Sequence, residues 1–154
     1  MALQRGLNDI ANEFEDAAAR TAAFLGDCQP ARRAGHPALA LAICGDAARA
    51  EKLAGEASKL HPLGTLWNAV ERPIMRAAIA LRRERAAEAI ELLQSAKPYE
   101  RAFPEAVYLR GLAYLRLEKR PEAQAEFRKI LDHRGANWGL FYALSQPGLA
   151  RATK

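Results

Sequence analysis

The chain has 154 residues, which is a length typical of one domain with a core of its own. Half of the residues are hydrophobic and 27% are charged, so the composition excludes an intrinsically disordered chain. No run approaches about 18 apolar residues, and we therefore expect no insertion into a membrane. Acidic residues stand near the start, where a signal peptide needs an apolar run, which favours a cytoplasmic location.

The net charge of +5 is unevenly distributed along the chain. Residues 1–60 carry 7 basic and 8 acidic side chains, whereas residues 61–154 carry 16 and 10. A basic second half favours acidic partners. The general use of arginine in an arginine-rich genome gives the same excess, so the charge alone identifies no partner.

The residue types predict helices. Alanine dominates, followed by leucine, glutamate and arginine, whereas valine, isoleucine and threonine are sparse. Apolar residues recur at steps of three and four from Leu7 to Leu25, which predicts the first helix. A loop rich in proline and glycine follows, and then a short helix over residues 38–45.

The next helices are separated by glycine and proline. Gly45 and Asp46 turn the chain into a helix that ends at the His61–Gly64 break. We expect Thr65 to cap the following helix through its hydroxyl group. Pro73 lies inside that pattern, so either the helix kinks there or a new helix starts with Pro73 in its first turn.

Further helical patterns fill the second half of the chain, and together they suggest about eight helices with no strand. Because the connections are short, neighbouring helices should form antiparallel hairpins. The patterns in this half cover residues 73–83, 86–96, 104–117, 121–133 and 138–152, the last of which has helical spacing up to Pro147.

One spacing organises these helices. RAAIALR, which starts at position 76, reappears as RGLAYLR from position 110, at an offset of 34. The same offset places Ala89 on Ala123 and Leu93 on Phe127. A weaker copy, GDAARAEKLAGEA at 45–57, matches ERAAEAIELLQSA at 84–96 with an offset of 39, which implies an insertion of five residues.

A 34-residue helix–turn–helix unit resembles the tetratricopeptide repeat. Gly111 and Tyr114 match its G-x-x-Y element, and Ala123 and Phe127 match A-x-x-x-F, although the early tryptophan of the motif is absent. The resemblance implies a single all-α domain, residues 1–154, built as a right-handed solenoid of stacked antiparallel helix hairpins. Its parts would be an N-terminal helix and loop (1–36), three repeats (37–62, 66–99 and 104–135) and a partial terminal repeat (136–154).

A narrower resemblance covers roughly residues 38–135. The strings AIELLQSAKPYE and AEFRKILDHRG resemble the C-terminal tetratricopeptide region of a group of bacterial serine/threonine protein kinases. This resemblance implies a sensor or docking region of a larger signalling protein. It implies no kinase activity here, because the chain has no glycine-rich loop and no DFG, and Gly135 stands where H-R-D would have its aspartate.

Other chemistry is not predicted. The three histidines fall in separate breaks without an i, i+4 partner, so we expect no metal site. Cys28 and Cys44 are too few for a disulfide framework, and the serines have no His/Asp context. We therefore expect no enzyme activity and no cofactor.

The expected function is protein–protein interaction. The first helices of the repeats, over 37–44, 66–83 and 104–117, would line a concave surface that binds a peptide or protein partner. Arg82 and Arg116 would stand side by side and grip a carboxylate, unless they pair with neighbouring glutamates on a solvated surface. The complete set of predicted partner-binding residues is Ile74, Ala78, Arg82, Tyr108, Leu112 and Arg116.

The end of the chain suggests an association surface. Trp138, Phe141 and Tyr142 belong to an apolar segment that no later helix covers. We therefore expect either that the chain is a fragment of a longer array or that this segment pairs with a second chain, most simply in a two-fold homodimer. The alternatives that remain open are a self-associating scaffold domain and a basic helical nucleic-acid-binding protein. Core packing of the aromatic residues, without interleaved basic residues on strands, argues against nucleic acid.

Overall fold

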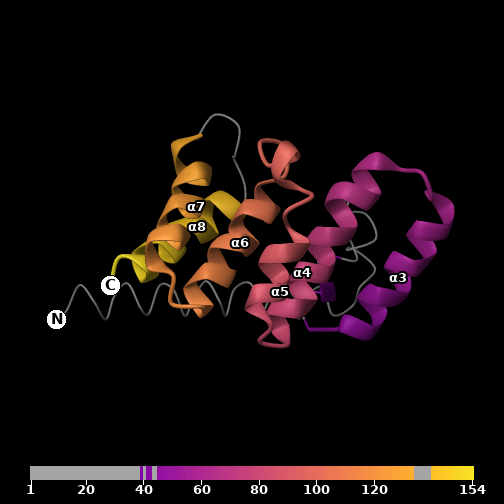
Figure 1. Ribbon diagram of the computed structural model, residues 1–154, viewed down its shortest axis with the longest axis horizontal. Helices are drawn as coiled ribbons and strands as arrows, with labels where there is room; N and C mark the ends of the chain where they lie inside the picture. Colours follow the sequence, from indigo (N-terminus) through magenta and orange to yellow (C-terminus); the bar gives the residue numbers. More distant parts are fainter. Residues whose placement is uncertain (1–38, 40, 43–44, 134–139) are drawn as a thin grey trace.

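The computed structural model describes residues 39, 41–42, 45–133 and 140–154 (Figure 1). Over these residues the chain is helical and has no β-strand, which confirms the all-α class. They contain the six α-helices α3 (Ala47–Leu60), α4 (Arg72–Arg82), α5 (Ala86–Leu92), α6 (Pro104–Arg116), α7 (Arg120–Asp132) and α8 (Leu140–Ala152), a π-helical turn η1 (Trp67–Glu71) and a 3-10 turn η2 (Lys97–Tyr99). The helix predicted over Leu7–Leu25 lies outside the described residues.

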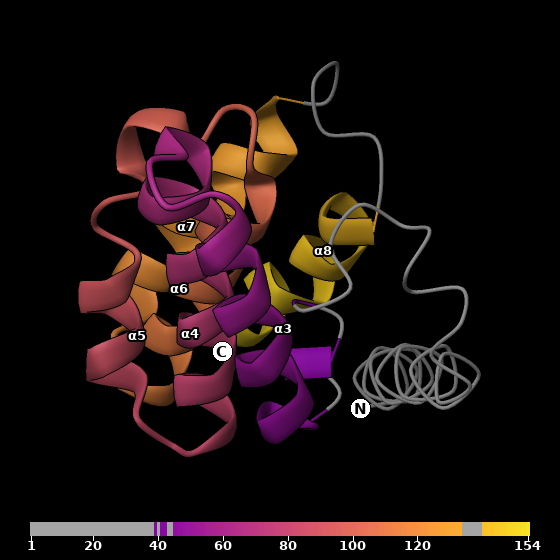
Figure 2. The ribbon, with the colours of Figure 1, turned by 90° about the vertical axis from the view of Figure 1, so that its right-hand side faces the viewer.

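The helices stand side by side in one row, with α3 at one end and α7 and α8 at the other (Figure 1). Figure 2 looks along this row from the α3 end. Each helix from α3 to α8 packs against the next in sequence. In addition α4 contacts α6, and α6 contacts α8, so that every second helix joins one pair to the following pair.

Three corners of the row share one backbone geometry. Residues 45, 84 and 118 each have a positive φ, of 92°, 58° and 58°. At each corner this residue donates its N–H to the carbonyl three residues back, and the next residue donates to the carbonyl five residues before itself. This is the Schellman pattern of a helix C-terminus. The corners recur at the same two offsets, 39 and 34, that relate the repeats in the sequence.

Small residues allow the helices that follow these corners to pack closely. Ala50, Ala89 and Ala123 occupy equivalent positions on the second helix of each pair, and all three have 0% exposed surface. The larger core cluster joins residues from 41 to 113, and a smaller one surrounds Phe127. The ring of Phe127 packs directly against two glycines. A Cβ atom on Gly111 would lie 2.8 Å from its Cε1 atom, and one on Gly148 would lie 2.7 Å from it.

A π-helical turn resolves the position of Pro73. The helix runs without a break from residue 65 to 82, and the N–H of Arg72 bonds to the carbonyl of Trp67 across the wider turn. Pro73 has no N–H to offer the carbonyl of Ala69. The hydroxyl group of Ser95 donates to that carbonyl instead, at 2.8 Å. Pro73 thus lies in the first turn of α4, on a helix that continues from residue 65 through the π-helical turn.

The start of this helix differs from the prediction. Thr65 is itself helical, and its hydroxyl group makes no capping hydrogen bond with a described residue. The side-chain amide of Asn68 holds the preceding turn, because it donates to the carbonyls of Pro62 and Gly64, both at 3.1 Å. An amide donor on the loop carbonyls thus fixes this turn in place of the expected threonine hydroxyl.

Candidate interaction surface

The two arginines predicted to bind a carboxylate each lie against the corner of the preceding helix pair. The guanidinium group of Arg116 donates to the carbonyl of Leu81 and lies 3.5 Å from the carboxylate of Glu84. One pair earlier, Arg82 lies beside Gly45, where a Cβ atom would be 3.1 Å from its Nη2 atom. Arg116 therefore pairs with a glutamate of the chain itself, as expected if the two arginines do not bind a partner's carboxylate. Arg82 is exposed and forms no ion pair with a described residue.

The other predicted partner-binding residues differ in accessibility. Ile74 and Ala78 are each 2% exposed and belong to the larger core cluster, so their side chains are not open to a partner in this state. Tyr108 and Leu112 are half-buried on α6. The structure thus brings Tyr108, Leu112 and Arg116 onto α6 as accessible side chains, and their role in binding stays a prediction.

Helix α8 carries two of the three residues predicted for association. Phe141 packs against Tyr108 of α6, with ring centroids 5.5 Å apart and planes tilted by 52°. Tyr142 is half-buried, and Trp138 lies outside the described residues. Part of the apolar segment therefore folds back on the chain itself, and the inner stripe of α8 at Ser145, Gly148 and Ala152 is buried.

A buried ion network joins three elements at the α6–α7 pair. Arg110 of α6 is fully buried, and its Nη2 atom bonds the carboxylates of Glu100 at 2.5 Å and Glu126 at 2.7 Å. Lys129 bonds the same two carboxylates, at 3.3 and 3.1 Å. The network ties the loop after η2 to both helices. The sequence marks Arg110 only as part of the repeat, because its partners are remote from it along the chain and belong to other elements.

The charges of the network support each other. Burial favours the neutral form of Glu100, but the hydrogen bond from Arg110 and the charge of Lys129 outweigh burial and hold the pKa of this carboxyl below its usual value of 4.5. Burial also opposes the charge on Arg110, yet Glu126 and Glu100 keep its pKa raised. The Nε and Nη1 groups of Arg110 are buried without a hydrogen-bond partner among the described residues. The network is thus strongly charged but incompletely satisfied.

Two further findings concern the described residues only. They contain no group of three or more histidine, cysteine, aspartate or glutamate side chains that could hold a metal ion. Within the same ranges, no helix is both long enough and apolar enough to cross a bilayer.

Comparison with known proteins identifies no relative of this chain. No family model matches it, and neither a curated protein nor a solved structure does.

Proposed function

We propose that this chain is a helical-repeat module for protein–protein interaction, of the tetratricopeptide type, and that it binds a peptide or protein partner along α4, α6 and α8. The proposal includes a right-handed solenoid of stacked helix hairpins and a role as a sensor or docking region of a larger signalling protein. No chemistry of the chain's own is part of this proposal.

The repeated corner is the observation that carries the proposal. Residues 45, 84 and 118 turn the chain with the same two hydrogen bonds, and the small residue five positions later is buried each time. A chain that repeats one corner and one contact stacks its units in one direction, which produces an extended surface. The contacts of α4 with α6 and of α6 with α8 support a continuous wall of first helices.

Helix α6 supplies the best-defined part of the surface. Tyr108 and Leu112 stand one turn apart and are half-buried, and Arg116 follows them at the exposed end of the helix. An apolar pair followed by a guanidinium group suits a peptide with an apolar anchor and a carboxylate. Because Arg116 already contacts Glu84 and Leu81, a carboxylate from the partner would have to displace the Glu84 contact.

A peptide selection tests this function. Random peptides displayed on phage are selected against the intact chain, and the affinity of the best peptide is measured for Leu112→Asp and for Ala125→Asp, an exposed alanine on α7. We expect Leu112→Asp to weaken binding by about tenfold or more, because anchor contacts dominate peptide affinity. The control should stay within about twofold. Selection of no peptide, or equal effects of the two variants, would contradict the proposal.

Self-association through the C-terminal segment is a second candidate. It rests on Tyr142, which is half-buried, and on α8, whose thirteen residues include no acidic side chain. Light scattering on size-exclusion chromatography should show a concentration-dependent dimer for the intact chain and a monomer for a chain that ends after residue 135. A stable monomer of the intact chain at high concentration would exclude this candidate.

A further inference from the structure

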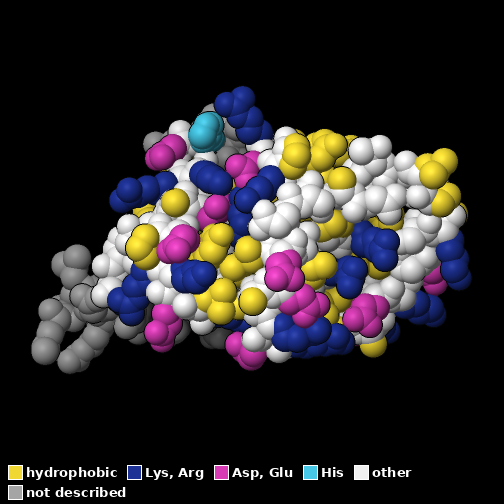
Figure 3. Space-filling model, in the orientation of Figure 1, with side chains coloured by type: hydrophobic (Ala, Val, Ile, Leu, Met, Phe, Trp, Pro, Cys, Tyr) yellow, Lys and Arg dark blue, Asp and Glu magenta, His cyan; other side chains and the backbone are white. Residues whose placement is uncertain are grey.

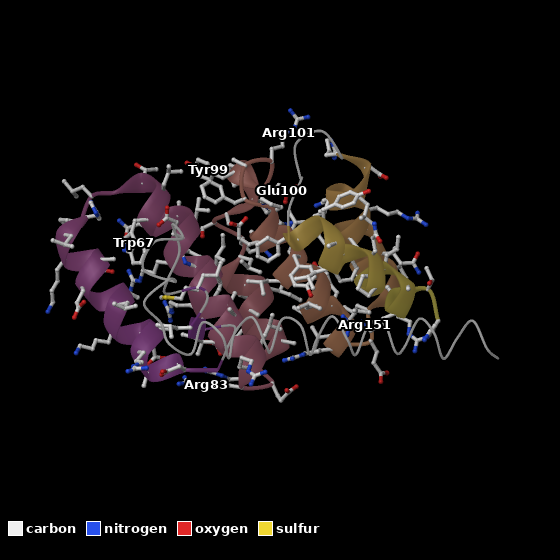
Figure 4. All side chains as sticks on the ribbon, turned by 180° about the vertical axis from the view of Figure 1, so that it is seen from behind. Trp67, Arg83, Tyr99, Glu100, Arg101 and Arg151 are labelled. Atoms are coloured by element: carbon white, nitrogen blue, oxygen red, sulfur yellow. The ribbon has the colours of Figure 1, made fainter. Side chains whose placement is uncertain are left out.

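The row of helices has two edges that differ in character. One edge carries the three tight corners at residues 45, 84 and 118. The opposite edge carries the α3–η1 turn and the loop that contains η2. In Figure 3, hydrophobic side chains stand out at the centre and right of the upper edge, charged side chains and a histidine lie at its left, and charged side chains dominate the lower edge. In Figure 4, Tyr99, Glu100 and Arg101 lie near the upper edge and Arg83 lies near the lower one.

Leucines project from the first connection of the upper edge. Leu60, Leu63 and Leu66 are 76%, 93% and 48% exposed. The described residues expose one other large hydrophobic side chain, Leu117, which is 37% exposed and lies at the opposite edge. We call Leu60, Leu63 and Leu66 the leucine corner. Large apolar side chains that are exposed together mark contact surfaces.

Side-chain hydrogen bonds hold the turn of the leucine corner, which is displaced outward. The helix 65–82 begins at residue 65, whereas the repeat offset places the start of α6 on residue 70, although both helices end at equivalent corners. The extra turn and a half carries the leucine corner about 7 Å farther along the helix axis. Asn68 fixes the turn through its two bonds to Pro62 and Gly64, and Trp67 donates to the hydroxyl of Ser58 at 2.9 Å. The exposed leucines therefore sit on a built turn.

The charges of this edge are basic. No acidic residue occurs between Ala57 and Val70, a stretch that includes Lys59. The neighbouring loop adds Lys97 and Arg101, and the hydroxyl of Ser95, just before this loop, donates to the carbonyl of Ala69 in η1. All three basic side chains are exposed, and none forms an ion pair with a described residue.

The acidic residue of the η2 loop is already neutralised. Glu100 follows η2, and its carboxylate is bound by Arg110 and Lys129. On the corner edge, by contrast, arginines pair with acids: Arg83 with Glu51 at 3.5 Å and Arg85 with Glu88 at 2.7 Å. The upper edge thus combines several projecting apolar side chains with unpaired positive charge, whereas ion pairs are frequent on the lower edge.

We propose that the edge formed by the leucine corner and the η2 loop rests on an anionic membrane surface. Apolar side chains that enter the headgroup region and basic side chains that face anionic lipids are the two signals that reversible surface binding needs. The leucine corner projects from the molecule, so it suits a deformable lipid surface better than a rigid protein partner, which would need a matching pocket. Such surface contact requires no membrane-spanning helix.

Vesicle co-sedimentation of the intact chain tests the proposal. The probes are vesicles of phosphatidylcholine alone and vesicles with about 30% phosphatidylserine. We expect binding to the anionic vesicles, weaker binding as salt is raised, and little binding to phosphatidylcholine. Leu63→Ser should lower the partition coefficient by about tenfold, because one leucine side chain no longer leaves water. Leu117→Ser, the matched control at the opposite edge, should change it by less than about twofold.

Charge variants test the contribution of the basic side chains separately from that of the leucines. Lys97→Gln with Arg101→Gln should lower binding by about fivefold for each residue, as the loss of one basic group near an anionic surface predicts. Arg120→Gln with Arg128→Gln removes the same charge from exposed positions of α7 and is the control. Absence of binding to anionic vesicles overturns the proposal. Equal losses for test and control variants also overturn it, because they indicate only the general attraction of a basic protein.

A second copy of the chain or an acidic protein is the competing occupant. If Leu63→Ser changes the oligomeric state in light scattering while vesicle binding is absent, the leucine corner is a protein contact and the proposal is wrong. Circular dichroism melts of each variant confirm that the fold is intact; because Leu63 is 93% exposed, its replacement should leave the midpoint unchanged.

Discussion

The α4–α5 pair and the α6–α7 pair turn at the same corner but fill their interiors differently. In the first pair, Ala77 and Leu93 occupy positions that Gly111 and Phe127 occupy in the second, and all four residues are buried. Arg76 is exposed, whereas its equivalent Arg110 is fully buried. The two pairs therefore share the corner and its small residues, whereas the side chains buried between their helices are aliphatic in the first pair and include an aromatic ring and a charged group in the second.

Replacing Arg110 and Arg76 in turn should affect stability very differently. Arg110→Ala removes the buried cation of the network and leaves the carboxylates of Glu100 and Glu126 with only the half-exposed Lys129, which should lower the free energy of unfolding by about 3–5 kcal/mol. Arg76→Ala removes an exposed side chain and should change it by less than about 0.5 kcal/mol. Urea denaturation of both variants measures the difference. Similar losses would show that the buried network contributes nothing specific.

The next prediction concerns the packing of Gly111 against Phe127. Gly111→Ala places a Cβ atom 2.8 Å from Phe127, and we expect overpacking to cost about 1–3 kcal/mol. Phe127→Leu alone leaves a cavity. The double variant recreates the alanine–leucine combination of Ala77 and Leu93, so its loss should be smaller than the sum of the two single losses. Strict additivity in the urea data would mean that these two residues do not share one packing site.

The third prediction concerns helix contact through small residues. Ala123→Leu and Ala89→Leu introduce large side chains at equivalent positions with no exposed surface, and each should cost about 1–3 kcal/mol. Ala125→Leu, at an exposed position of α7, is the control and should have little effect. Thermal melts that show no loss for either buried alanine would contradict the shared geometry of the two pairs.

Acid should act on the α6–α7 pair through Glu100. Since the pKa of Glu100 is lower in the folded chain than in the unfolded one, its charge stabilises the fold above the usual value of 4.5, and this contribution is lost as the pH falls through the lowered pKa. Glu100→Gln should therefore flatten the acid side of the stability curve. Glu91→Gln, an exposed carboxylate on α5, is the control. Parallel acid profiles for the wild type and Glu100→Gln would contradict this role.

The smallest change in stability is expected at the corner residues themselves. Glu84 and Glu118 adopt a left-handed backbone that costs a residue with a side chain about 1 kcal/mol. Glu84→Gly and Glu118→Gly should each raise the free energy of unfolding by about 0.5 kcal/mol, after the greater flexibility of glycine in the unfolded chain is subtracted. Gly45→Ala should have the opposite sign, because its φ of 92° disfavours a side chain that would also approach Arg82. Equal signs for all three would mean that the corners are not equivalent.

The sequence predicts the helices and their repeat because both depend on local spacing. The two offsets between the repeats locate all three corners, and the buried alanines fall where the alignment places them. The ion network around Arg110 was not predictable in this way. Its carboxylates come from a loop and from another helix, and no periodicity distinguishes Arg110 from the exposed Arg76.

The candidate surface, too, was predictable only where it depends on local spacing. Tyr108 and Leu112 are half-buried on α6 and Arg116 is exposed, whereas Ile74 and Ala78 are covered on α4, and helical spacing alone does not predict this difference. Nor did the stripe of apolar residues reveal the leucine corner. The exposure of its leucines follows from the longer first helix, and the insertion of five residues seen in the alignment was the available signal.

The π-helical turn before Pro73 changes the direction in which side chains point at the start of this helix relative to those at its end. A wide turn holds one residue more than an α-helical turn, so every side chain before it is rotated by about 100° relative to an unbroken α-helix. Deleting one residue within Trp67–Glu71 would restore the regular spacing and rotate Leu66 and the chain before it by that angle. The direction in which the leucine corner faces thus depends on the extra residue of this turn, and a deletion here would also move Ala50 and Ala54 of α3 relative to the core that they share with α4.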